Sequence, residues 1–283
     1  MRLDGPDHPA PAKLNLFLHV IGRRADGYHL LQSAFALIDA ADRLRFAIRI
    51  DGRIRRVSDL PGVTEEADLV VRAAALLKAE SGTGLGADIE VDKRLPLGGG
   101  VGGGSSDAAT TLIVLNRLWK TGLDRPALLA LGARLGADVP FFVFGRNAWV
   151  EGVGERLTPL DLPPAWYLVL VPPVAVPTGE IFAAPELTRH TEALKIEDFS
   201  AHAGPDRFRN DLEAVVAARY PRVREHLAWL ARHGPGGRLT GSGACVFSRF
   251  EDRDAAERVL EKLPGTMKGF VAQGLEEHPL RGF

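Results

Sequence analysis

The sequence predicts a mixed α/β protein built from two domains. Its 283 residues are too many for one small hydrophobic core, and 46% of them are apolar, as in an ordinary globular protein. Residues 14–20 and 42–50 alternate or run apolar in the manner of strands, which excludes an all-helical fold. Residues 66–80 place their apolar side chains on one helical face, so strand and helix patterns both occur early in the chain.

The same mixture continues along the chain. Strands are expected at residues 34–39, 87–91, 148–152, 166–171, 244–250 and 269–274, and helices at residues 126–135, 210–219, 222–233 and 252–263. The most regular helical pattern covers residues 105–119. We expect this helix to open at Ser105 or Ser106 and to carry Asp107 in its first turn.

A proline-rich stretch separates the two predicted domains. Residues 155–165 read ERLTPLDLPPA, and their three prolines interrupt both the strand and the helix period. We therefore expect one domain over residues 1–157 and a second over residues 158–283.

Opposite charges nearly cancel, with 35 Lys and Arg against 36 Asp and Glu. No overall positive field would gather nucleic acid, so we expect no nucleic-acid partner. No apolar run approaches the roughly 20 residues that cross a bilayer, so we expect no membrane partner either. One stretch concentrates arginines at near-alternate positions, which predicts a solvated strand face: Arg43, Arg45, Arg49, Arg53, Arg55 and Arg56.

The chain has a single cysteine, Cys245. One cysteine excludes an intramolecular disulfide and a multi-cysteine metal site, which fits a reducing compartment and predicts a cytoplasmic protein. We expect Cys245 to be a small buried apolar residue and not a nucleophile.

The most informative segment is the glycine run LPLGGGVGGGSSD at residues 95–107. Each glycine lowers folding stability by roughly 0.5–1 kcal/mol relative to alanine in a regular element, so we expect a structural or functional requirement for them. Without Cβ atoms, successive backbone N–H groups can approach an anion closely. The helix that follows adds its unpaired N–H groups and the positive end of its dipole. Strand, glycine loop and helix in this order predict a phosphate-binding site.

Two familiar nucleotide motifs fit this run poorly. Gly98, Gly100 and Gly103 satisfy G-x-G-x-x-G, but that spacing is almost unavoidable among so many glycines. The Walker pattern requires a lysine directly before Ser105, and glycine stands there. A purely structural glycine loop is the remaining alternative.

The string PLGGGVGGGSSD at residues 96–107 resembles the ATP-binding signature of the GHMP kinases, a superfamily of small-molecule kinases. Further segments resemble the branch whose acceptor is a cytidine diphosphate-linked methylerythritol in the non-mevalonate route to isoprenoids. They are PAKLNLFLHVIGRRADGYHLLQS at 11–33, GADVPFF at 136–142, PTGEIFAAPELTR at 177–189 and LTGSGACVF at 239–247. The resemblance covers most of the chain. It implies a two-domain GHMP kinase fold with the active site in the cleft between the domains.

The resemblance implies ATP as phosphate donor. Its phosphates are expected along Pro96, Leu97, Gly98, Gly99, Gly100, Val101, Gly102, Gly103, Gly104, Ser105 and Ser106. A serine at a helix start is also an ordinary cap, and one serine can serve both purposes. Mg²⁺ is expected because ATP arrives with it, although the sequence contains no visible cluster of metal ligands.

The resemblance identifies Lys13 and Asp138 as the catalytic pair. By sequence pattern alone, an acidic residue shortly before Pro140 is a helix cap. The resemblance instead makes Asp138 the base that takes the proton from the acceptor hydroxyl. Lys13 would hold Asp138 ionised and stabilise charge on the oxygen or the γ-phosphate, because an opposite charge within about 4–6 Å lowers a carboxylate pKa.

The resemblance also outlines the acceptor pocket. It implies that the cytidine end of the substrate lies against Asn15, Tyr28 and His29, with Thr178 and Phe182 forming the far wall. Tyr28 can stack on a pyrimidine, and Phe182 is expected to oppose it across the base. The His29 ring can meet the hydrogen-bonding edge of that base. By sequence pattern alone, Phe182 fits core packing equally well.

Two further positions are compared with the family pattern, one that matches it and one that departs from it. Gly241, Ser242 and Gly243 are similar to the superfamily's C-terminal glycine motif, which shapes the cleft near the catalytic lysine. Asp68 departs from the family pattern, which has asparagine at the start of helix 68–80. The acidic side chain leaves an adenine contact at this position in question.

Three other functions compete with this reading. Another GHMP kinase, acting on mevalonate, homoserine or a sugar, would share the glycine loop, whereas residues 14–29 favour the cytidyl acceptor. A non-catalytic nucleotide-binding regulator would have no need to keep both Lys13 and Asp138. A nicotinamide-dependent oxidoreductase rests only on the weak G-x-G-x-x-G match.

Overall fold

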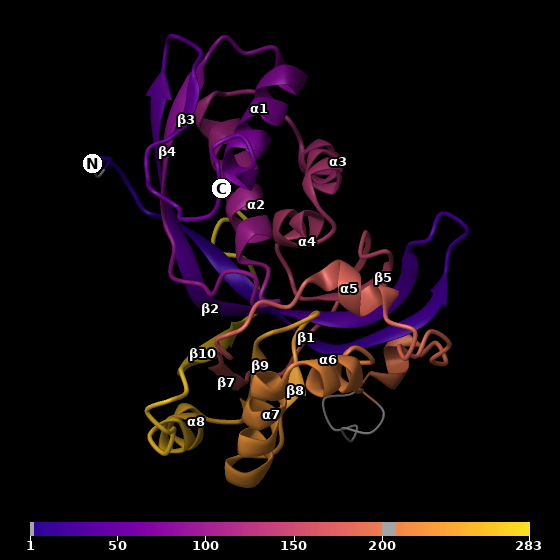
Figure 1. Cartoon of the computed structure of the whole chain (residues 1–283). Helices are drawn as coiled ribbons and strands as arrows, with labels where there is room; N and C mark the ends of the chain where they lie inside the picture. The colour runs from indigo at the N-terminus through magenta and orange to yellow at the C-terminus, as the bar shows by residue number, and fades with distance from the viewer. Residues whose placement is uncertain (1–2, 200–207) are drawn as a thin grey trace.

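Two long strands near the start of the chain organise the fold. The computed structural model describes residues 3–199 and 208–283, and in it β1 (His8–Arg23) pairs antiparallel with β2 (His29–Arg49) along almost the full length of both. This ribbon crosses the molecule between an upper and a lower group of elements (Figure 1). Both halves of the chain are built against it.

β2 is continuous through the segments expected as separate strands at residues 34–39 and 42–50. The pairing changes register between Pro11 and Ala12 of β1, so that Asp39 and Ala40 of β2 form a bulge and the strand continues beyond them.

The second edge of β2 joins the two halves of the chain. Along this edge β2 pairs in turn with β5 (Ala148–Gly152), β10 (Gly269–Leu275) and β4 (Gly86–Asp92). β6 (Arg156–Pro159) continues from β5, and β3 (Ile54–Arg56) lies parallel to β4. β10 leads on to β7 (Trp166–Leu170), β9 (Val246–Phe250) and β8 (Arg238–Leu239), so the strands of both halves in the described chain form one sheet.

The helices form two groups. The first group, beside β3 and β4 in Figure 1, contains α1 (Leu69–Ser81), α2 (Gly103–Leu118), α3 (Arg125–Leu135) and α4 (Val139–Phe144). The second contains α5 (Thr178–Ala183), a short 3-10 turn (Ile196–Asp198), α6 (Glu213–Arg219), α7 (Pro221–His233) and α8 (Arg253–Leu260). Each group encloses a hydrophobic core of its own. The predicted mixed α/β fold is confirmed.

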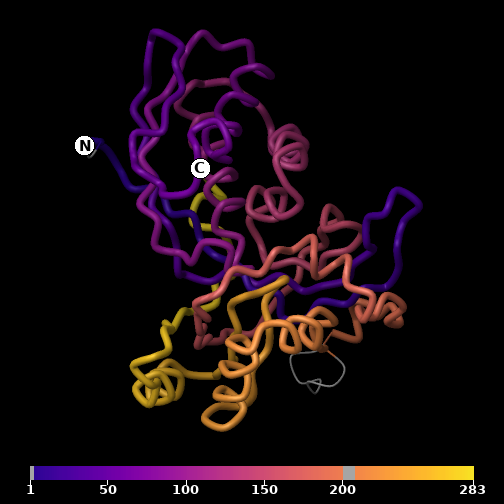
Figure 2. The backbone as a smooth tube through the Cα atoms, in the orientation of Figure 1, coloured from indigo at the N-terminus to yellow at the C-terminus, as the bar shows by residue number. Residues whose placement is uncertain are grey.

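The end of the chain returns to the first half. In Figure 2 the C-terminus lies among the N-terminal elements, and Leu280 belongs to the first hydrophobic core. The His278 N–H donates to the Gly145 carbonyl at 3.0 Å. The boundary expected between residues 157 and 158 falls inside β6 and stays a prediction.

The predicted start of α2 is wrong by two or three residues. The helix begins at Gly103, because Gly102 adopts a left-handed φ of 75° at the N-cap and turns the loop directly into the helix. Asp107 therefore lies beyond the first turn, and it is buried. The last two loop glycines thus belong to the helix.

The sequence suggested that the arginine-rich stretch forms a solvated strand face, and the structure contradicts this for part of the stretch. Arg45 is buried and pairs with Glu90 at 3.2 Å. The Arg56 side chain is only 8% exposed and pairs with Asp68. Arg53 remains exposed. Acidic partners on β4 and at the start of α1 draw two of the arginines inward.

Cys245 is buried, as expected, and burial raises the pKa of its thiol to about 12. This thiol stays protonated and unreactive at neutral pH. Within residues 3–199 and 208–283, no helix is long and apolar enough to cross a membrane.

Candidate active site

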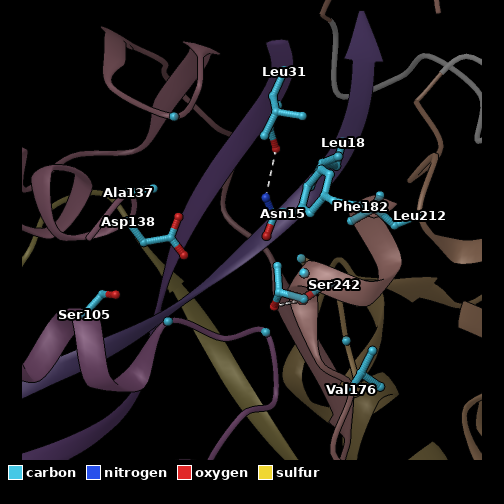
Figure 3. A pocket seen from close by; sticks show the side chains of 18 of the residues that line it. Asn15, Leu18, Leu31, Ser105, Ala137, Asp138, Val176, Phe182, Leu212 and Ser242 are labelled. Atoms are coloured by element: carbon cyan, nitrogen blue, oxygen red, sulfur yellow. Dashed lines mark hydrogen bonds between the residues drawn. The ribbon is translucent and has the colours of Figure 1, made fainter. Parts of the chain in front are cut away.

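A cavity of about 970 Å³ lies between elements of the two halves, beside β1 and β2. Its lining includes every predicted catalytic and acceptor residue: Lys13, Asn15, Tyr28, His29, Asp138, Thr178 and Phe182. In Figure 3, Asp138 and Ser105 lie on one side of the cavity, Phe182 and Ser242 lie on the other, and Asn15 lies between them. The fold therefore brings together segments from both ends of the sequence.

The glycine loop is packed against the C-terminal half as well as open to the cavity. A Cβ at Gly100 would lie 2.3 Å from the Thr240 carbonyl oxygen, and one at Gly99 would lie 2.7 Å from Cys245 Sγ. The Cys245 N–H also donates to the Gly99 carbonyl at 3.0 Å. Gly98 has a positive φ of 65° but open space around it. Close packing between the halves is thus a second reason for the glycines.

The start of α2 presents unbonded backbone N–H groups to the cavity. The first backbone bond of the helix runs from Ser106 N to the Gly102 carbonyl at 2.9 Å, and Gly102 has no side chain to cap the turn. The N–H groups of Gly103, Gly104 and Ser105 therefore have no partner within the helix, and all three residues line the cavity. Together with the positive end of the helix dipole, they form a cradle suited to phosphate.

Two residues of the predicted phosphate loop do not line the cavity. Val101 is buried, and its carbonyl accepts the Lys13 N–H at 2.9 Å. Ser106 is also buried, and within the described residues its Oγ has no hydrogen-bond partner. Ser105 faces the cavity instead (Figure 3). The helix turns the Ser106 side chain inward, and its expected contact with a phosphate stays a prediction.

Lys13 is a buried lysine with fixed partners. Its side chain is 3% exposed. The ammonium lies 2.6 Å from Asn15 Oδ1, 3.3 Å from Asp138 Oδ2 and 4.5 Å from the centre of the Phe35 ring. A buried charge is costly unless it is paired and hydrogen-bonded, so these contacts determine where the ammonium sits.

Asp138 occupies the N-cap position of α4 without acting as a cap. Its carboxylate makes no hydrogen bond to the helix backbone. The side chain is 32% exposed and lines the cavity. The carboxylate is therefore available to a ligand on one side while Lys13 contacts it on the other.

Asn15 lines the cavity, but its amide is bonded to the protein. Its Oδ1 accepts from the Lys13 ammonium, and its Nδ2 donates to Ser33 Oγ at 3.1 Å. Its backbone N–H donates to Thr240 Oγ1 at 3.0 Å. These bonds orient Lys13, whereas the expected contact of Asn15 with the cytidine end stays a prediction.

The aromatic residues predicted for the acceptor pocket line the same cavity. The rings of His29 and Phe182 lie 5.1 Å apart at an interplanar angle of 34°. Tyr28 is 65% exposed at the turn between β1 and β2. Thr178 Oγ1 lies 2.7 Å from Ser242 Oγ, which ties the start of α5 to the loop after β8. The ring that faces Phe182 is thus His29, while Phe182 also packs on the second core.

Sequence reasoning missed a buried ion cluster behind the glycine loop. Lys93 Nζ lies 2.8 Å from Asp107 Oδ2 and also contacts the Asp42 carboxylate. Asp42 accepts the backbone N–H groups of Arg94 and Leu95 at 2.6 and 2.8 Å. Burial raises the pKa of Asp107 to about 7, although the Lys93 charge opposes this shift. The cluster connects β2, residues 93–95 after β4 and the first turns of α2. Its residues look like ordinary surface charges in the sequence, and only their burial in the structure distinguishes them.

Asp68 has a structural role. Its carboxylate accepts the Val70 N–H at 3.0 Å, which caps α1, and it pairs with Arg56. Its neighbour Leu69 lines the cavity, and Asp68 does not. The acidic departure from the family pattern therefore serves the helix and gives no support to a ligand contact.

Two family models match the chain. The model for the GHMP kinases N terminal domain matches residues 68–146, and the model for the GHMP kinases C terminal domain matches residues 184–269. The first match contains the glycine loop and Asp138. Together with the free helix start and the Lys13–Asp138 pair in one cavity, these matches define the class of protein as a GHMP kinase.

Curated relatives narrow this class. The 4-diphosphocytidyl-2-C-methyl-D-erythritol kinases of Aromatoleum aromaticum and Thiobacillus denitrificans are both 62% identical to the chain. Their alignments cover 98% and 97% of this chain, and 96% and 97% of those proteins. The chain belongs to the 4-diphosphocytidyl-2-C-methyl-D-erythritol kinase family.

Solved structures agree with this assignment. A crystal structure of 4-(cytidine 5'-diphospho)-2C-methyl-D-erythritol kinase superposes with a TM-score of 0.83 at 36% identity, covering 95% of this chain and 99% of that one. A mevalonate kinase superposes with a TM-score of 0.72 at 13% identity, covering 96% of this chain and 100% of that one. The second likeness shows the fold alone.

Proposed function

We propose that the chain transfers the γ-phosphate of ATP to the 2-hydroxyl of 4-diphosphocytidyl-2-C-methyl-D-erythritol, within the non-mevalonate route to isoprenoid precursors. Its family membership makes it an ATP-dependent small-molecule kinase. The observation that supports the choice of chemistry most directly is the Lys13–Asp138 pair, which shares one cavity with the free helix start of α2.

The donor end would hold the ATP phosphates by backbone groups. The N–H groups of Gly103, Gly104 and Ser105 and the dipole of α2 suit anionic oxygens, and the open space at Gly98 admits a close approach. Pro96 and Leu97 line the same stretch of the cavity. Phosphoryl transfer depends mainly on such positioning and on charge stabilisation.

Asp138 would act as the general base. Its carboxylate takes the proton of the acceptor hydroxyl as the oxygen attacks the γ-phosphorus, and the bond to the leaving oxygen of ADP breaks. The buried ammonium of Lys13, 3.3 Å from the Asp138 carboxylate, would stabilise negative charge on the reacting oxygens. General base catalysis typically contributes roughly 10²–10⁴-fold.

Mg²⁺ is proposed as the companion of ATP. It prefers oxygen ligands and usually binds through one or two carboxylates or hydroxyls together with substrate phosphates and water. The Ser105 hydroxyl and the Asp138 carboxylate are oxygen donors in the cavity and fit this requirement. When bound, the ion neutralises charge on the transferring phosphates.

The acceptor would lie toward the other end, with its pyrimidine among Tyr28, His29 and Phe182, and with Thr178 nearby. The aromatic faces suit a planar base, and the distance between this end and Asp138 is spanned by a single continuous cavity. Asn15 lies between the two ends (Figure 3).

Competing functions have less support. The only support for a mevalonate or homoserine acceptor is similarity of fold to solved structures of such kinases, which are 13–15% identical to this chain in sequence. A non-catalytic regulator would not require a buried lysine in contact with Asp138. We also propose a cytoplasmic location and a domain boundary after residue 157.

Transfer of label from γ-labelled ATP tests the proposal. The chain is incubated with the cytidyl alcohol, mevalonate and homoserine in parallel, with and without EDTA. We expect rapid labelling of the cytidyl alcohol alone, and its loss when EDTA removes Mg²⁺. Equal or faster labelling of mevalonate would contradict the proposed acceptor.

A further inference from the structure

Arg189 bonds both walls of the acceptor end from behind. It lies in the segment after α5, is half-buried, and is not part of the cavity lining. Its Nε donates to His29 Nε2 at 3.1 Å. Its Nη2 donates to the carbonyls of Phe182 and Ala184 at 2.9 and 2.6 Å, and its Nη1 donates to the Leu187 carbonyl at 3.0 Å. One guanidinium therefore holds His29 of β2 and the end of α5 together.

This contact determines which nitrogen of His29 carries the proton. A guanidinium has five N–H donors, accepts no hydrogen bond and stays charged, so Nε2 of His29 must accept through its lone pair. A neutral ring with a lone pair on Nε2 carries its hydrogen on Nδ1. Burial, Arg189 and Arg23 all lower the pKa of His29, which keeps the ring neutral. Nδ1 has no protein partner among the hydrogen bonds of the described residues, so it remains for a ligand, as a donor.

The same contact fixes the plane of the ring. His29 lies 5.1 Å from Phe182, whose own carbonyl is held by Arg189. A histidine at the start of a strand would otherwise rotate about its side-chain bonds. Holding it before the substrate arrives removes an entropy cost of binding, roughly 0.5–1.5 kcal/mol for each side chain immobilised.

We propose that Arg189 is a positioning residue for the acceptor, which fixes His29 as the Nδ1–H tautomer against Phe182 and so favours a base that accepts a hydrogen bond at its ring nitrogen N3. This inference rests on the proposed function. Cytosine offers an unprotonated N3 beside its O2 carbonyl, whereas N3 of uracil carries a hydrogen and would face donor with donor. The tautomer therefore favours a cytosine ring over a uracil ring.

The tautomer is measured without substrate. Nitrogen-15 NMR of the histidine rings in the full chain, with the His29 signal assigned by its loss in His29→Phe, distinguishes protonation on Nδ1 from protonation on Nε2. We expect Nδ1–H in the wild type and a shift toward Nε2–H, the form favoured by free imidazole, in Arg189→Met. A wild-type ring protonated on Nε2 would overturn the proposal, whatever the acceptor proves to be.

The kinetic consequence is measured with the acceptor, ATP, and two competing nucleotides, cytidine 5'-diphosphate and uridine 5'-diphosphate. Arg189→Met should raise KM for the acceptor roughly tenfold, leave KM for ATP within about twofold, and reduce the preference for the cytidine nucleotide. Arg189→Lys keeps the charge without the planar fork and should recover the preference only partly. Arg219→Met is the matched control, because its exposed pair with Glu186 lies in the same region outside the cavity.

A double-mutant cycle separates positioning from simple support of the fold. In a His29→Phe background, which keeps an aromatic ring beside Phe182, Arg189→Met should have little further effect on nucleotide preference. An equal loss in both backgrounds would mean that Arg189 only supports the segment after α5, and the proposal would be wrong. Absence of any turnover of the cytidyl alcohol would instead contradict the proposed function, while the NMR measurement would still decide the role of Arg189.

Discussion

The two ends of the cavity are built from different parts of the polypeptide. The proposed donor end is made of backbone: a glycine loop and the first turn of α2, whose residues line the cavity and have N–H groups without a partner in the helix. The acceptor end is made of side chains from distant segments, with Tyr28 and His29 at the β1–β2 turn and Phe182 on α5. Backbone N–H groups fit any phosphate and aromatic faces stack on any base, so selectivity for one base would depend on hydrogen-bonding groups such as His29.

This difference explains why one end identifies a superfamily and the other a substrate. The donor cradle needs only glycine and a helix start, which any member with the same donor can share. The acceptor end depends on contacts such as Arg189 with His29, which a different acceptor would not need. Asp138 lies on the same side of the cavity as Ser105, and we propose that it serves the transfer step together with Lys13.

The largest effect is expected at Asp138, on the donor side of the cavity. Asp138→Asn removes the base while keeping the shape of the side chain, so kcat should fall by roughly 10²–10⁴-fold with little change in ATP binding. Steady-state kinetics and calorimetric ATP titration measure the two quantities. Asp124→Asn is the control, because Asp124 only caps α3 and asparagine caps equally well. An Asp138→Asn variant with near wild-type kcat would remove Asp138 from the base role.

The donor end is tested by a pair of glycines. Gly100→Ala places a Cβ 2.3 Å from the Thr240 carbonyl, so the loop must shift, and we expect kcat/KM for ATP to fall by about 10²-fold. Gly98→Ala has a similar positive φ but open space, so only backbone strain of roughly 1–2 kcal/mol applies. Initial rates across ATP concentrations compare the two variants. Equal losses in both would show that packing against the C-terminal half is unimportant.

The acceptor end is tested at Tyr28. Because this side chain is 65% exposed, Tyr28→Ala should not change the melting temperature. Loss of one stacked ring should raise KM for the acceptor roughly tenfold, since stacking on a base is worth about 1–3 kcal/mol. Tyr28→Phe keeps the ring and should behave almost as the wild type. A rise in KM for ATP would contradict the assignment of Tyr28 to the acceptor end.

The smallest effect is expected behind the donor end, in the ion cluster. Burial raises the pKa of Asp107 to about 7 from an ordinary 3.8. At pH values between these two pKa values, the Asp107 carboxyl is ionised in the unfolded chain but still protonated in the folded protein. Rising pH therefore favours unfolding. Asp107→Asn cannot ionise, and its melting temperature relative to the wild type should rise by about 2–4 °C from pH 5 to pH 8. Differential scanning calorimetry at both pH values measures this, and a pH-independent difference would show that Asp107 does not titrate there.

The donor end was largely predictable because its requirements are local. Six glycines followed by a helical period already specify a loop that approaches an anion, and this needs no distant partner. The residue at which the helix begins was harder to predict from the sequence, because Gly102 and not a serine occupies the N-cap. The inward turn of Ser106 follows from that starting residue and from packing that no local pattern contains.

The acceptor end and the charge clusters required the fold. Only the family resemblance assigned Tyr28, His29 and Phe182 to the acceptor pocket. Nothing in the sequence indicated that the ring facing Phe182 is His29 and not Tyr28. Arg189 and Lys93 are ordinary charges by composition. Their roles arise because the structure buries or surrounds them with specific partners.

The sequence by itself determined the mixed α/β class and predicted a phosphate loop and, through resemblance, a catalytic pair, because these depend on local period, glycine content and short motifs. Tertiary structure alone decided that Asp138 contacts Lys13 instead of capping α4, and that the glycine loop is packed against the C-terminal half. The physical reason is distance along the chain. Burial, ion pairing and the direction in which a side chain points depend on partners that only folding brings into contact.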